Sequence, residues 1–80
     1  SETLKKVRVG LKEISSKREN RIIDENGNPR RLNLEGRKKV AELFLEALEK
    51  EPEAFGYDVV ALKNKLETFL KNAREKTLSL

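Results

Sequence analysis

The sequence contains no cysteine and no histidine among its 80 residues. Without cysteine there is no disulfide framework, no thiolate nucleophile and no zinc–sulfur site. Without histidine, the commonest general base and the commonest transition-metal ligand are both missing. The glycine patterns of the Walker, Rossmann and nucleophile-elbow motifs do not occur either. We therefore expect a protein that is not an enzyme and that binds no cofactor and no metal.

Long apolar runs are missing as well. No stretch approaches the roughly 18 apolar residues that a membrane span needs. Residues 1–20 carry scattered charges in place of the apolar block of a signal peptide. We expect no membrane contact, and a cytoplasmic location or production only in a recombinant host.

Methionine, tryptophan and glutamine do not occur either, so five residue types are missing. For a chain of average composition, losing all five has a chance on the order of one in ten thousand. Adaptation to heat depletes glutamine, cysteine and methionine. The chain nevertheless keeps six of the equally heat-labile asparagines. The pattern therefore predicts an engineered or computationally chosen sequence.

Charged residues make up 40% of the chain and hydrophobic residues 36%, and 18 basic against 14 acidic side chains give a net charge of +4. This length and apolar content suit one small domain spanning residues 1–80. We expect a monomer.

The clearest element is a predicted helix over residues 58–75. Asp58 is a good N-cap. The apolar residues that follow are spaced by 3, 4, 3 and 4 positions, which places them on one helix face: Val59, Leu62, Leu66, Phe69 and Ala73. We expect Leu66 and Phe69 to be nearly fully buried.

A second helix is predicted over residues 34–50. Asn33 caps it, and Pro52 ends it because the residue before a proline disfavours helix. Its apolar positions are Val40, Leu43, Phe44, Ala47 and Leu48. In the link that follows, Pro52 opens a single turn that Gly56 closes, and we expect Tyr57 to join the core.

The first segment, residues 2–17, fits two patterns. Leu4, Val7, Leu11 and Ile14 form a helical stripe. Val7, Val9 and Leu11 also alternate with polar or small residues, which suits a strand over residues 4–12. Gly10 weakens a helix by about 1 kcal/mol. We prefer the helix because it explains more apolar positions.

Residues 20–33 join the first two helices and contain strong turn signals, Asn26-Gly27 and Asn28-Pro29. A short hairpin pairing residues 21–24 with residues 30–32 would satisfy their backbone groups. The expected fold is therefore all-α: a small three-helix bundle over residues 2–17, 34–50 and 58–75, with a turn or short hairpin between the first two helices.

Residues 24–35 resemble a calcium loop of the EF-hand type. Asp24, Asn26, Asn28 and Glu35 occupy positions 1, 3, 5 and 12 of that loop. Its sixth position requires glycine for a sharp turn, and Pro29 stands there. We interpret the segment as a polar turn that does not bind calcium.

Basic residues concentrate in the first half of the chain, where residues 1–39 carry 12 basic and 6 acidic side chains. The densest basic patch consists of Arg30, Arg31, Arg37, Lys38 and Lys39. Cations in the first turns of a helix oppose its macrodipole, which suits a surface that holds phosphate. A solubilising surface is the competing interpretation. The link over residues 51–57 is too long for a helix-turn-helix motif.

Three functional hypotheses follow. The first is a stably folded small domain without enzymatic activity. The second is a basic helical module that binds nucleic acid through the basic patch, with an affinity that falls steeply with salt. The third is a protein-interaction module that presents a helix face. An exposed apolar patch above a few hundred Å² would favour the third.

Overall fold

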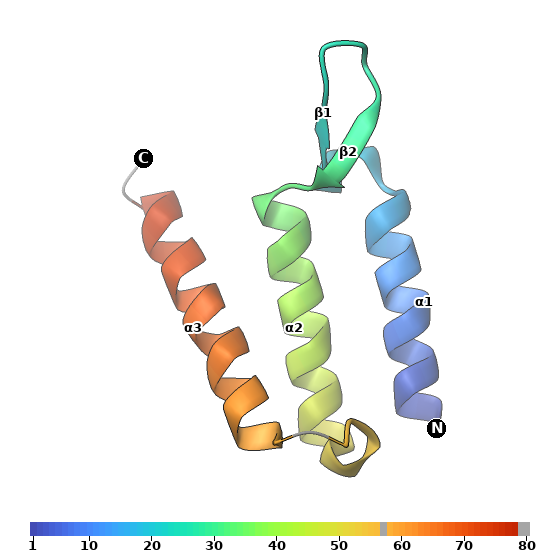
Figure 1. Ribbon diagram of the computed structural model, residues 1–80, viewed down its shortest axis with the longest axis vertical. Coiled ribbons are helices and arrows are strands. Elements are labelled where there is room, and N and C mark those ends of the chain that lie inside the picture. The colour runs from blue at the N-terminus through green and yellow to red at the C-terminus, as the bar shows by residue number, and fades with distance from the viewer. Residues whose placement is uncertain (57, 79–80) are drawn as a thin grey trace.

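The computed structural model describes residues 1–56 and 58–78, with side chains up to residue 74. The elements are α1 (Glu2–Ser16), the single-turn helix η1 (Arg18–Asn20), β1 (Arg21–Ile23), β2 (Pro29–Leu32), α2 (Leu34–Lys50), the single-turn helix η2 (Pro52–Ala54) and α3 (Val59–Leu78). The three predicted helices are confirmed (Figure 1). Over the described residues, no helix combines the length and apolar character of a membrane span.

Helix α1 is continuous over residues 4–12, the segment whose apolar pattern was also compatible with a strand. The Ser1 side chain accepts a hydrogen bond from the backbone N–H of Leu4 at 3.3 Å and caps its first turn. Val7 is buried while Val9 is 54% exposed. The helical period explains this difference, since residues two apart lie on different faces of a helix.

The link between α1 and α2 folds into an antiparallel hairpin, with Arg21 opposite Leu32 and Ile23 opposite Pro29. Gly27, in the turn, has a φ of 82°, a backbone conformation that suits glycine. The predicted hairpin is confirmed. The all-α class is too narrow, because the backbone groups of this link find their partners in a two-stranded sheet.

The three helices lie side by side in one layer, with α2 between α1 and α3 (Figure 1). The principal extents are 42 × 30 × 15 Å, and the shortest leaves room for little more than one helix. The radius of gyration is 14.1 Å, whereas a compact domain of this length has about 11.6 Å. The arrangement is therefore flatter than the expected closed bundle.

Few large side chains are fully buried in this layer. The buried apolar residues among those described are Val7, Ala41, Ala47, Leu48 and Ala73. Leu66 and Phe69 are only half-buried, so the expectation of nearly full burial is wrong. The reason is that α3 packs chiefly against α2, which leaves one side of its apolar stripe uncovered. Tyr57, expected in the core, lies outside the described residues.

A buried asparagine joins α1, the hairpin and α2. Asn20 is 1% exposed, and its Nδ2 donates to the carbonyl of Ile14 at 3.0 Å. Its Oδ1 accepts from Lys39 Nζ at 2.9 Å. Its backbone carbonyl accepts from the N–H of Asn33 at 2.9 Å. One residue thus connects three elements.

Gly36 allows α2 to begin against this asparagine. A Cβ at Gly36 would lie 2.5 Å from the backbone oxygen of Asn20. Asn33 caps the helix as predicted, since its Oδ1 accepts from the N–H of Gly36 at 2.9 Å. Because the clashing atom belongs to the backbone, a side chain at Gly36 cannot be accommodated by a change of rotamer.

Gly36→Ala is expected to lower the free energy of unfolding by about 1–3 kcal/mol, the usual cost of overpacking. Gly10→Ala is the matched control, because its Cβ would meet only the flexible end of Leu43, at 2.8 Å. At Gly10, the gain in helix propensity of about 1 kcal/mol offsets the cost of moving the Leu43 side chain away from the new Cβ. Urea unfolding followed by circular dichroism measures the free energy of unfolding of both variants. Equal stability of the two variants would contradict the assigned role of Gly36.

Candidate functional site

Three members of the basic patch are engaged within the fold. Arg30 Nε lies 2.8 Å from Asp24 Oδ2, and Lys38 Nζ lies 3.4 Å from Glu35 Oε1. Lys39 Nζ donates to the buried Asn20. Arg31 and Arg37, on β2 and α2, have no side-chain hydrogen bond or ion pair within the described part of the chain. The structure therefore uses a large part of this patch to hold the hairpin and the start of α2 in place.

Two further arginines, which sequence analysis did not single out, fasten the hairpin. Arg18 Nη2 donates to the carbonyl of Gly27 at 2.7 Å. Arg21 donates to the carbonyl of Arg30 at 2.6 Å through Nε and to that of Ser15 at 3.2 Å through Nη1. Only the three-dimensional arrangement identifies these acceptors, because they are backbone atoms distant in sequence.

The segment that resembles a calcium loop is a polar turn, as predicted. Asp24 Oδ1 accepts from the backbone N–H groups of Asn26 at 2.9 Å and Asn28 at 2.8 Å, and Oδ2 is paired with Arg30. Glu35 lies in the first turn of α2, paired with Lys38. Over the described residues, no three histidine, cysteine, aspartate or glutamate side chains gather into one cluster.

The main concave surface of functional interest is an apolar groove between α2 and α3. One part has a volume of about 640 Å³ and is lined chiefly by Val40, Phe44, Phe55, Ala61, Leu62 and Leu66. A second part, of about 250 Å³, extends toward the hairpin and is lined by Leu32, Arg37, Val40, Ala41, Leu66 and Phe69. Val40 and Leu66 line both parts, so the two adjoin one another along α2 and α3, and together they are called the α2–α3 groove.

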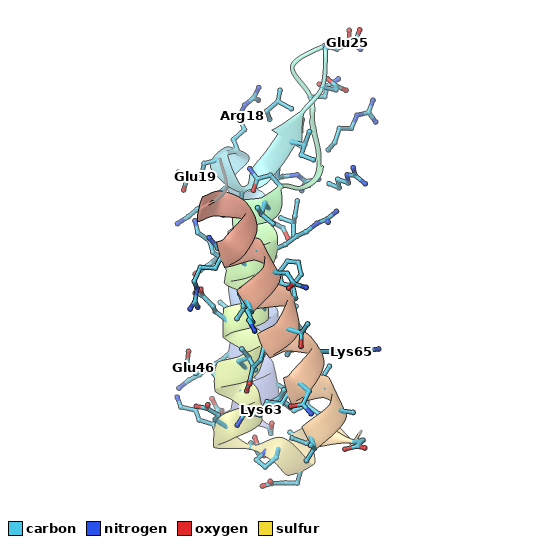
Figure 2. All side chains as sticks on the ribbon, turned by 90° about the vertical axis from the view of Figure 1, so that its left-hand side faces the viewer. Arg18, Glu19, Glu25, Glu46, Lys63 and Lys65 are labelled. Atoms are coloured by element: carbon cyan, nitrogen blue, oxygen red, sulfur yellow. The ribbon has the colours of Figure 1, made fainter. Side chains whose placement is uncertain are left out.

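Charged residues stand at the two ends of this groove. Arg37 lies at the hairpin end, and Asp58 lies at the opposite end. Lys65 lines the groove from α3 and projects outward from the layer (Figure 2). At the Asp58 end, the rings of Phe44 and Phe55 meet at a tilt of 59° with their centroids 6.2 Å apart.

An apolar floor with charges at its ends is suited to binding an elongated apolar surface. The apolar spacing in the sequence located most of these residues but assigned them to the core. An apolar helix face becomes core or groove according to how many neighbouring helices cover it. The spacing of apolar residues along the sequence does not show that number.

Protonation of Asp24 is expected to loosen the hairpin turn below pH 3.8. The N–H of Asn28, followed by the Arg30 guanidinium, lowers the pKa of Asp24 from its ordinary value of 3.8. A lowered pKa in the folded chain means that the ionised group contributes stability above the unfolded pKa and loses it as the pH falls through the folded pKa. In an NMR titration, the Asn28 amide should shift with a midpoint below 3.8. A midpoint at or above this value would refute the assignment. Asp24→Asn is the non-titrating control.

The chain was compared with protein-family models, curated proteins and solved structures. No family model matches it. No curated protein and no solved structure matches it either. The functional argument therefore rests on the geometry of the groove and of the basic patch.

Proposed function

We propose that this chain is a non-enzymatic interaction module whose α2–α3 groove takes an amphipathic helix of a protein partner. The observation that carries the proposal is the elongated apolar groove on an unusually open molecule. The accessible surface is 6198 Å², whereas a compact monomer of 9.2 kDa exposes about 4,900 Å². The excess reflects the single-layer arrangement of the helices and the protruding hairpin, which leave apolar side chains exposed on several elements.

The shape and chemistry of the groove suit a helix. It lies between two packed helices, and a third helix can lie along such a groove with its apolar side chains inserted. The lining is apolar over most of its length, while Arg37 and Asp58 mark its two ends. An amphipathic helix that has acidic residues near one end and basic residues near the other therefore complements it.

The other two hypotheses stay predictions. A folded domain without enzymatic activity can also be an interaction module, so the first hypothesis agrees with the proposal. An engineered origin would be compatible with either function. Nucleic-acid binding through the basic patch receives less support than groove binding, because Arg30, Lys38 and Lys39 already contact groups of the fold.

A synthetic amphipathic peptide with leucines at helical i, i+3, i+4 and i+7 spacing tests the proposal. In NMR titrations, amide shifts should concentrate at Val40, Ala61 and Leu66 and spare the outer face of α1 around Val9. Ala61→Glu should lower the affinity for the peptide by about tenfold or more, because a carboxylate would be buried against the bound helix without a partner.

Thr68→Glu is the matched control, since Thr68 is exposed on the same helix and does not line the groove. It adds the same charge and should leave the affinity unchanged. Shifts centred on α1, or equal losses in the two variants, would show that the groove is not the binding surface.

A further inference from the structure

We propose that the helix taken by this groove is α3 of a second copy of the chain, in an antiparallel two-fold pair. This inference rests on the proposed function and names its partner. In a two-fold pair the same surface is used by both copies, so the surface must complement itself. The α2–α3 face meets this requirement in shape and in charge.

The shape is self-complementary because α3 is both a wall of the groove and an amphipathic helix. Ala61 and Lys65 are exposed on it, and Leu62, Leu66 and Phe69 are half-buried beside them. The small side chain of Ala61 allows close approach of a second helix. Two copies laid face to face would form two layers of helices, which is the smallest arrangement that usually encloses a core.

The chain exposes more surface than a compact monomer of its mass. The accessible surface of 6198 Å² exceeds that of a compact monomer by about 1,300 Å². A standard protein–protein interface buries about 800 Å² on each partner. A pair of standard size would remove part of this excess, which also includes exposed apolar side chains on α1 and the hairpin, such as Val9, Ile22 and Ile23.

Charge fixes the direction of the pair. At the hairpin end of α2, residues 35–39 carry three basic side chains and one acidic one, whereas residues 42–58 carry six acidic and one basic. Arg37 and Asp58 lie at opposite ends of the groove, as do the starts of α2 and α3 in Figure 1. An antiparallel pair sets each Arg37 against the Asp58 of the other copy. A parallel pair would set like charges together.

Charge reversal at these two positions tests the proposal. Sedimentation velocity over a concentration series should show a reversible dimer of the full chain. Arg37→Glu alone and Asp58→Lys alone should each weaken it by about tenfold or more, because each creates two like-charge contacts. An equimolar mixture of the two variants should restore association to within about threefold of the original, since both contacts are then opposite in charge.

Circular dichroism confirms that each variant is folded. Asp58 also caps α3 by accepting from the N–H of Ala61 at 3.3 Å, so Asp58→Asn serves as a control that keeps an N-cap and removes the charge. It should weaken the dimer less than Asp58→Lys. Single variants that associate as well as the original chain would overturn the antiparallel arrangement.

The peptide titration separates this inference from the proposed function. A chain that stays monomeric at all concentrations, yet binds the peptide in the groove, refutes the second copy and leaves the groove intact as a helix site. A monomer that does not bind the peptide refutes both. A dimer that Ala61→Glu does not weaken would place the contact on another face.

Discussion

The buried amide of Asn20 is the interaction on which the first half of the structure depends. It is bonded to the carbonyl of Ile14 and to the ammonium group of Lys39, while its own backbone oxygen accepts from Asn33. A buried polar group left without a partner costs about 1–3 kcal/mol. The end of α1, the base of the hairpin and the start of α2 must therefore keep their positions together. Position 36 is therefore occupied by glycine, because no side chain fits where α2 meets this junction.

Helix α3 makes none of the Asn20 hydrogen bonds and is held by packing against α2. It follows α2 through η2 and packs chiefly on the side of α2 opposite to α1. With one neighbour, its apolar stripe is covered along one edge, which leaves Leu66 and Phe69 half-buried. The α2–α3 groove is thus a direct result of the layered arrangement. A second copy would supply the missing neighbour and turn the groove into a core.

The sequence predicted the local structure well because that structure is encoded locally. Apolar spacing located three helices, Asn33 located the start of α2, and the Asn–Gly and Asn–Pro pairs located the hairpin. The arrangement of the helices was not accessible, because a stripe such as Val59 to Ala73 looks the same in a layer and in a closed bundle. The partners of the basic patch were equally hidden, since Lys39 meets Asn20 from 19 residues away.

In the proposed two-fold pair, α3 gains stability from the second copy, whereas the Asn20 junction does not. Amide hydrogen exchange at protein concentrations of about 10 µM and about 1 mM tests this most directly, because association adds stability that depends on concentration. Protection of the α3 amides is expected to rise with concentration, while that of the amides around Asn20 and Gly36 stays constant. Protection of α3 that is strong and equal at both concentrations would contradict it.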